Sequence, residues 1–191
     1  MGIDVGTSNV KAVLFDEKGT EIQVASRVSE TINDGGNNEE QDMTIVWEKV
    51  KACITELMDS KVVAAEDIKG IGVTGQGEGC WLIDKEGKPL QNAILWCDGR
   101  AVAEVHKITE EHPEIGKLYH RTTGTPPLLG NQMMLLRWMK SHRKDVLDKG
   151  YKILFCKDWI RYNLTGKIGT EITDSFTSLI DAQTGKIAED L

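Results

Sequence analysis

The chain opens with two short runs in which apolar and polar residues alternate. Residues 2–5 and 9–15 each have the two-residue period of a strand, with Gly6-Thr7-Ser8 between them. The second run ends in Asp16-Glu17-Lys18-Gly19, which is typical of a tight turn, and a weaker alternation follows over residues 21–28. The pattern therefore predicts three consecutive strands joined by tight turns.

The rest of the chain mixes helical and strand patterns. After a turn-rich surface loop over residues 33–38, apolar residues recur at helical spacing from a cap at Asp42 or Thr44 to about Ser60. Residues 68–74 predict a short, buried, parallel strand. Further strands are predicted at residues 80–84, 94–97 and 151–156, and helices from about residue 100 to before Pro113, at 131–140 and at 158–164, the last ended by Gly166. The order predicts an α/β sheet with an antiparallel meander at one side.

The first turn carries groups that suit a phosphate. Backbone N–H groups of Gly6, Thr7 and Ser8, with two hydroxyls, can face one anion. Asp4 precedes the turn, where its carboxylate could hold hydrated Mg²⁺ beside a polyphosphate, and Lys11 could supply a positive charge. An acidic residue inside an apolar run is unfavourable unless it has a partner or a metal. A plain hairpin with a solvated lysine explains the same residues, so spacing alone leaves both interpretations open.

A glycine-rich loop follows the predicted strand at residues 68–74. This loop, Gly75-Gln76-Gly77-Glu78-Gly79, is no dinucleotide fingerprint, because a strand pattern rather than a helix follows its last glycine. Loops at the carboxyl ends of strands are where α/β sheets bind ligands, and Gln76 and Glu78 suit hydroxyl groups. A glycine turn with two solvated polar residues is the alternative.

The segment Trp96-Cys97-Asp98-Gly99-Arg100 also follows a predicted strand. Asp98 and Arg100 would hydrogen-bond vicinal hydroxyls of a sugar, with Trp96 as an apolar wall. A helix cap at Asp98, with Arg100 as its ion-pair partner, is the alternative.

Composition narrows the class of protein. The chain has 191 residues, a net charge of −7 and a pI near 5.2, which suit one domain and argue against a nucleic-acid partner. No apolar run is long enough to span a membrane. Four dispersed cysteines match no zinc spacing and predict buried, reduced thiols of a cytoplasmic protein, and the four histidines are expected at the surface.

These segments together resemble the N-terminal domain of the FGGY carbohydrate kinases. The resemblance extends over essentially the whole chain, with the motifs in the family's order and spacing. The motifs are G-I-D-V-G-T-S-N-V-K-A-V-L-F-D at the start, G-V-T-G-Q-G-E-G, I-L-W-C-D-G-R, K-D-W-I-R-Y-N-L-T-G and T-E-I-T-D-S.

The resemblance implies a ribonuclease H-like fold of the actin/hexokinase type, a mixed sheet flanked by helices. It also implies Mg²⁺- and ATP-dependent phosphoryl transfer to a sugar or polyol hydroxyl. Asp4 matches the family's acidic position near the metal. The turn at residues 6–8 and Lys11 match the phosphate-binding positions. Gln76, Gly77 and Glu78 match the loop that contacts the sugar, and Asp98 and Arg100 match the D-x-R that follows the next strand. Lys157, Asp158 and Asp174 match later motifs, for which we expect mostly structural roles.

Two departures from the family pattern bear on function, and the first concerns the substrate. D-Xylulose kinases carry Met-His after the glutamine and glycerol kinases carry Arg-Glu, whereas Gly77-Glu78 follows Gln76 here. This argues against glycerol and resembles the L-xylulose or erythritol kinase branch. The expected substrate is L-xylulose, with D-xylulose and erythritol as alternatives.

The second departure concerns the catalytic base. The family takes the hydroxyl proton with an Asp in a glycine-Asp-Gln segment, and that segment does not occur in these 191 residues. The resemblance places this Asp beyond Leu191, so no residue of the chain is expected to act as the base. We therefore expect residues 1–191 to be the N-terminal kinase domain, truncated before the base and without the C-terminal domain, and inactive alone. A non-catalytic sugar- or nucleotide-binding module is the alternative from another class. A homodimer is left open.

Overall fold

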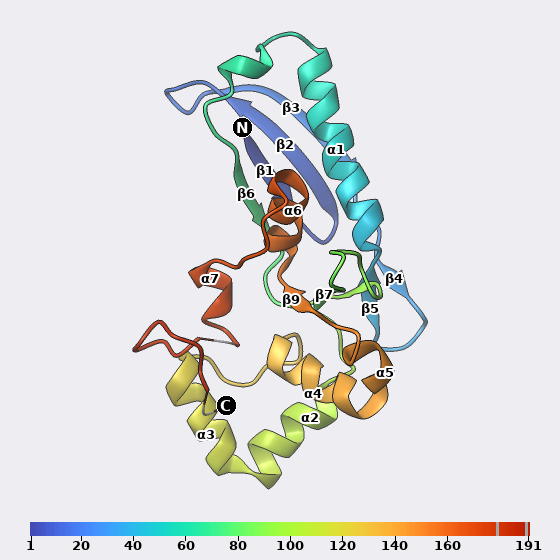
Figure 1. The fold of residues 1–191 in the computed structure, drawn as a ribbon, viewed down its shortest axis with the longest axis vertical. Coiled ribbons are helices and arrows are strands. Elements are labelled where there is room, and N and C mark those ends of the chain that lie inside the picture. The colour runs from blue at the N-terminus through green and yellow to red at the C-terminus, as the bar shows by residue number, and fades with distance from the viewer. Residues whose placement is uncertain (179, 190) are drawn as a thin grey trace.

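A four-stranded sheet forms the centre of the upper part of the molecule (Figure 1). The computed structural model describes residues 1–178, 180–189 and 191. β1 (Gly2–Val5) and β3 (Glu21–Val28) both pair antiparallel with β2 (Asn9–Phe15), and β6 (Gly72–Gly75) pairs parallel with β1. The predicted α/β sheet with an antiparallel meander at one side is confirmed.

One face of this sheet is covered by two helices. α1 (Met43–Asp59) packs on β2 and β3, and α6 (Cys156–Thr165) packs beside β6. Because successive side chains of a strand point to opposite faces, Ile3 and Val5 are buried beneath the helices while Asp4 is exposed on the other face. The expectation that Asp4 needs a partner in an apolar setting is therefore wrong.

The predicted helical spacing accounts for how α1 packs. Val46, Val50, Cys53 and Leu57 are all buried on its sheet-facing side. Asp42 is the cap, and its carboxylate accepts hydrogen bonds from the backbone N–H groups of Thr44 and Ile45. Burying each aliphatic side chain of this set contributes about 1.5–3 kcal/mol.

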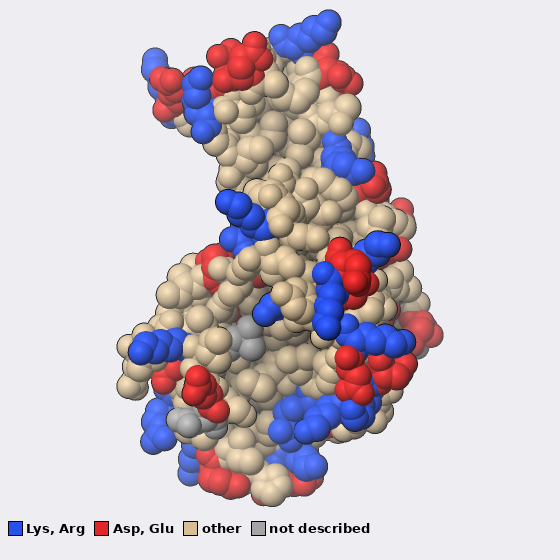
Figure 2. Space-filling model, viewed as in Figure 1, with Lys and Arg blue, Asp and Glu red and all other residues tan. Residues whose placement is uncertain are grey.

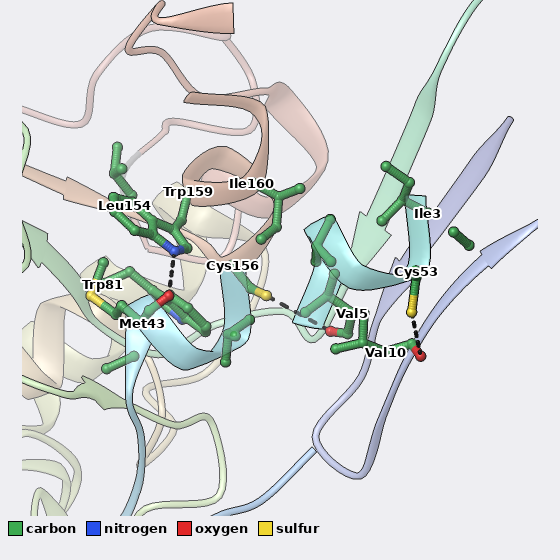
Figure 3. Close-up of a cluster of buried hydrophobic side chains, with 14 of the residues drawn as sticks. Ile3, Val5, Val10, Met43, Cys53, Trp81, Leu154, Cys156, Trp159 and Ile160 are labelled. Carbon is green, nitrogen blue, oxygen red and sulfur yellow. Dashed lines mark hydrogen bonds between the residues drawn. The ribbon is translucent and has the colours of Figure 1, made fainter. Parts of the chain in front are cut away.

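The core between the helices and the sheet also contains polar contacts (Figure 3). Trp159 Nε1 donates to the Met43 carbonyl at 2.9 Å, which joins α6 to the start of α1. The Cys156 thiol lies 3.7 Å from the Val5 carbonyl, where α6 meets β1. These contacts fix α6 against the end of β1 from which the first turn begins.

A second, mainly helical part lies below the sheet in Figure 1. Its core is apolar and includes Ile94, Tyr119, Leu135 and Met139. The short strands here are β4 (Ile32–Asn33), β5 (Glu39–Gln41) and β8 (Ala93–Ile94) in one sheet, and β7 (Trp81–Ile83) paired with β9 (Lys152–Leu154). The helices are α2 (Val102–His106), the π-helix η2 (Lys107–Glu111), α3 (Pro113–Thr123), α4 (Gln132–His142), α5 (Lys144–Leu147) and α7 (Ile172–Ser175), and the 3₁₀ helix η1 (Ala65–Asp67) precedes β6.

Three local predictions need correction. The predicted buried strand at residues 68–74 is the shorter, partly exposed β6, because it is the outer strand of its sheet. The predicted strand at 94–97 reduces to β8, since the chain turns after Leu95. The sequence pattern predicts no helix after Pro113, yet α3 begins there with this proline in its first turn.

The cysteines are buried as predicted, except one. Cys53, Cys80 and Cys156 are buried, and burial raises the pKa of Cys80 to about 12. Cys97 is exposed, contrary to expectation, because it lies in the turn after β8. All four histidines are exposed as predicted.

Acidic and basic side chains are interspersed over the face shown in Figure 2. The outline of this face is indented beside β6, and the surface there is largely free of charged side chains. Among the described residues, no helix is long and apolar enough to cross a bilayer.

Candidate functional site

The carboxyl ends of β1 and β6 open into a cleft of about 450 Å³. The two strands are parallel neighbours, so the loops that follow them emerge at the same edge of the sheet. The cleft is lined by Asp4, Gly6, Thr7, Gly75, Gln76, Gly77, Glu78 and Trp96. The structure thus brings residues of all three predicted segments together.

The first turn presents backbone donors. The Gly6 N–H donates to the Asn9 carbonyl at 2.9 Å and closes the turn. Within the part of the chain that the structure describes, the N–H groups of Thr7 and Ser8 donate to no protein acceptor. Adjacent unpaired N–H groups in a turn form a concavity for an anion. Ser8 itself is exposed beside the cleft rather than among its lining residues.

Asp4 and Lys11 lie opposite each other in the β1–β2 register, and both are exposed. Asp4 lines the cleft and Lys11 does not. No cluster of three or more His, Cys, Asp or Glu that could hold a metal exists among the described residues. Mg²⁺ keeps most of its waters and takes one or two carboxylates together with substrate phosphates, so a single carboxylate beside a turn with unpaired N–H groups fits the needs of this ion.

The glycine-rich loop enters the cleft from β6. The Gln76 N–H donates to the Val5 carbonyl at 2.9 Å and extends the parallel pairing by one residue. Glu78 then adopts a left-handed backbone, with φ of 57°, which is rare for a residue other than glycine. Asn131 Nδ2 donates to Glu78 Oε1 at 2.7 Å and holds the carboxylate in place.

Burial raises the pKa of the Glu78 carboxyl, and hydrogen bonds from Thr177 and Asn131 offset this only in part. A raised pKa in the folded state means that the folded protein holds this proton to higher pH than the unfolded chain. The contribution of Glu78 to the free energy of unfolding is therefore fully present below its pKa in the unfolded chain. It is lost as the pH rises through its pKa in the folded protein.

The substitution Glu78→Gln should therefore stabilise the fold at pH 7, because a neutral amide keeps the Asn131 contact without a buried charge. The gain should shrink as the pH falls below the ordinary glutamate value of 4.5. Urea denaturation at pH 7 and pH 4 measures both effects. A gain of the same size at the two pH values would contradict the assignment to ionisation.

Trp96 connects this loop to the first turn. Its ring is about half exposed in the cleft, and its Nε1 donates to Thr7 Oγ1 at 3.1 Å. The Thr7 hydroxyl in turn donates to Gln76 Oε1 at 3.3 Å. The residues predicted for phosphate and those predicted for sugar are therefore in direct contact.

Asp98 and Arg100 lie outside the cleft. Their side chains are 0% and 3% exposed, and Arg100 Nε and Nη2 donate to the two Asp98 carboxylate oxygens, each at 2.8 Å. The second oxygen also accepts the Glu39 N–H, and Arg100 pairs with Glu40. Of the alternative interpretation, the ion pair of Arg100 with Asp98 is confirmed. The helix cap at Asp98 is wrong, since α2 begins after Ala101 with no side-chain cap. This geometry argues against the predicted sugar contact, because both side chains are buried outside the cleft and both Asp98 carboxylate oxygens already accept hydrogen bonds.

The base expected beyond Leu191 stays a prediction. Leu191 itself is half-buried and packs against the apolar core of the lower part of the molecule, so it adds nothing to the cleft. Among the cleft-lining residues that the structure describes, Asp4 and Glu78 carry the carboxylates.

Two residues of the site region are not predicted from the sequence. Gln41, on β5, and Asn131, at the start of α4, are both fully buried and hydrogen-bonded to the glycine-rich loop. Gln41 precedes Asp42, the cap of α1, and Asn131 directly precedes α4, so neither belongs to a segment predicted to bind a ligand. Their burial as hydrogen-bonded polar side chains, which only the structure reveals, marks them as part of the site region.

Residues 1–190 match the family model described as the FGGY family of carbohydrate kinases, N-terminal domain. The chain therefore belongs to the FGGY carbohydrate kinase family, and its fold is the mixed α/β domain of that family.

Several individual proteins are similar to this chain in sequence or in structure. The chain is 33% identical over 188 residues to a probable L-xylulose kinase of Pasteurella multocida, and 37% identical over 172 residues to the L-xylulose/3-keto-L-gulonate kinase of Escherichia coli. These matches cover 97% and 90% of this chain but only 38% and 34% of the relatives. A xyloylose kinase from Brucella ovis has a TM-score of 0.91 at 28% identity, over 99% of this chain and 39% of that structure. The chain thus spans little more than a third of the length of these relatives.

Proposed function

We propose that this chain is the N-terminal part of an ATP-dependent kinase that phosphorylates a pentulose or a related sugar or polyol, with L-xylulose as the first candidate. The observation that carries the proposal is the shared cleft, in which a phosphate-type turn faces a loop suited to hydroxyl groups. The proposal is also supported by family membership and by the similarity to the two L-xylulose kinases above.

The proposed roles follow from position. The free N–H groups of the turn would bind the phosphates of ATP, Asp4 would hold hydrated Mg²⁺ next to them, and Lys11 would add a positive charge at the edge. Magnesium would supply charge neutralisation for the transferred phosphoryl group. Phosphoryl transfer depends mainly on positioning and charge stabilisation, so the protein's task is to hold the two substrates in line.

The hydroxyl-binding role falls to the other side of the cleft. Gln76 and Glu78 would accept and donate hydrogen bonds to the sugar, with the exposed ring of Trp96 against its C–H face. Gly77 also lines the cleft, and a Cβ added there would lie 3.6 Å from Asp174 Oδ1, an ordinary van der Waals contact. The loop lacks the histidine of D-xylulose kinases and the arginine of glycerol kinases, which supports L-xylulose over D-xylulose and leaves erythritol as an alternative.

ADP formation by the complete protein that contains this chain, with ATP and Mg²⁺ and each of L-xylulose, D-xylulose and erythritol, tests the proposal. We expect the highest kcat/KM with L-xylulose. A higher value with another of the three would replace that substrate. No ADP formation with any of them would overturn the kinase, and saturable sugar binding without turnover would favour a non-catalytic module. Residues 1–191 alone should form no ADP, because they lack the expected base.

A matched pair of variants tests the site in the same assay. Asp4→Asn should lower kcat by roughly 100-fold or more, the scale of losing one preorganised electrostatic group. Asp59→Asn, an exposed carboxylate at the end of α1, should leave kcat unchanged.

A further inference from the structure

Gln41 stands at the centre of a buried hydrogen-bond ring between the two halves of the cleft. Its Nε2 donates to the Thr7 carbonyl at 2.9 Å and to Ser29 Oγ at 3.0 Å. Its Oε1 accepts from Gln76 Nε2 at 2.7 Å. Gln76 Oε1 accepts from the Thr7 hydroxyl at 3.3 Å, which returns the ring to the first turn.

The ring has one consistent direction. Thr7 donates to Gln76, Gln76 donates to Gln41, and Gln41 donates back to the Thr7 backbone. Turning over either amide would place two donors or two acceptors face to face. Gln41 is fully buried, so such a mismatch would leave polar groups unpaired away from water. The ring therefore fixes the orientation of the Gln76 amide that the sugar would meet.

Gln41 is itself held by a rigid support. It is the last residue of β5, which pairs with β8 on one side and β4 on the other. The Asp98–Arg100 ion pair grips the two preceding residues of this strand, through the Glu39 N–H and the Glu40 carboxylate. The buried pair therefore supports Gln41 through β5, although neither Asp98 nor Arg100 lines the cleft.

We infer that Gln41 is a positioning residue that locks the phosphate turn to the sugar loop, so that binding of sugar and binding of nucleotide reinforce each other. This inference rests on the proposed function for the identity of the two ligands. A sugar that orders Gln76 would also order Thr7 through Gln41, and nucleotide bound at the turn would act in reverse. Such coupling is reciprocal and typically changes affinity by roughly 5- to 150-fold.

The variant Gln41→Met keeps the length of the side chain and removes all three hydrogen bonds. Gln23→Met is the matched control, since Gln23 lies on β3, away from the cleft, and accepts one hydrogen bond from Ser60 at the end of α1. Thermal unfolding of both variants shows whether each protein is folded before any ligand is added.

The first measurement needs no ligand. Hydrogen exchange in the complete protein should become roughly fivefold or more faster in Gln41→Met at the hydrogen-bonded N–H of each segment, Gly6 in residues 6–9 and Gln76 in residues 75–78. This is the factor expected for one lost net hydrogen bond. The control should leave both segments unchanged. Faster exchange at only one of the two segments, or at neither, would overturn the inference whatever the protein's substrate.

The second measurement is the dissociation constant of L-xylulose with and without ADP. In the wild type and in Gln23→Met, ADP should tighten sugar binding by about fivefold or more. In Gln41→Met this factor should fall to about one. A purely structural role would instead raise the dissociation constant of L-xylulose equally with and without ADP and preserve their ratio. An unchanged ratio would overturn the inference. Wild-type protein that binds neither ligand, with the exchange result as expected, would overturn the proposed function and the coupling while retaining the lock.

Discussion

Replacing Arg100 with methionine is expected to lower the free energy of unfolding by about 3–5 kcal/mol, because it leaves Asp98 buried without its counter-charge. The Asp98 carboxylate is 0% exposed, and Arg100 satisfies both of its oxygens. The guanidinium also lies 5.0 Å from the centre of the Trp138 ring, so the substitution removes a further contact. Urea denaturation of the purified chain measures the loss.

A second ion pair provides the control for this prediction. Arg27 pairs with Glu56 at a similar distance, 2.7 Å, but their side chains are 39% and 47% exposed. Arg27→Met should therefore change stability by no more than about 1 kcal/mol. The double variant Asp98→Asn with Arg100→Met should recover part of the lost stability, since asparagine has no charge that would be left buried without a partner. Equal effects of the two arginine substitutions would contradict the role of burial.

Replacing Gly79 with alanine is expected to destabilise the protein by about 2–5 kcal/mol through two separate effects. The residue has φ of +81°, where a side chain costs about 1–2 kcal/mol. An added Cβ would also lie 2.6 Å from the Ile94 carbonyl, and such crowding by backbone costs about 1–3 kcal/mol more. Because Glu78 and Trp96 flank this contact, sugar affinity should fall together with stability.

Gly166 separates the two effects. It has φ of +70° at the end of α6, yet nothing lies within 4 Å of an added Cβ. Gly166→Ala should therefore show the conformational loss alone, about 1–2 kcal/mol, and leave sugar binding unchanged. Denaturation of both variants, with sugar titrations on the complete protein, measures the difference. A Gly79→Ala loss no larger than that of Gly166→Ala would show that the loop can move away from β8.

The elements with strong periodicity could be predicted from sequence. The alternation of β1 to β3 and the helical spacing of α1 both come from one face packing on one core. The pattern does not reveal α3, because Pro113 is also a sound signal for the end of a helix, and here it starts one instead. The burial of residues 68–74 is overestimated because an apolar run does not show that its strand is the outermost one.

The part of the candidate site that could be predicted consists of residues whose position depends only on the strand that they end or follow. Asp4, Thr7, Gln76 and Glu78 lie at or directly after strand ends, and the topology brings those loops together. The placement of Asp98 and Arg100 depends on β5, a strand far away in sequence, so no local pattern reveals that both side chains are buried outside the cleft. Gln41 escapes prediction for the same reason, since its partners lie 34 and 35 positions away.

The turn after β8 makes one thiol chemically addressable. Cys53, Cys80 and Cys156 are buried, whereas Cys97 is exposed and adjoins Trp96, whose indole borders the cleft. Partial burial, with Glu39 and Asp98 nearby, raises the pKa of Cys97, so a maleimide should couple to it most readily in mildly alkaline buffer. A fluorophore attached there would sit one residue from the cleft wall and could follow ligand entry without any engineered cysteine.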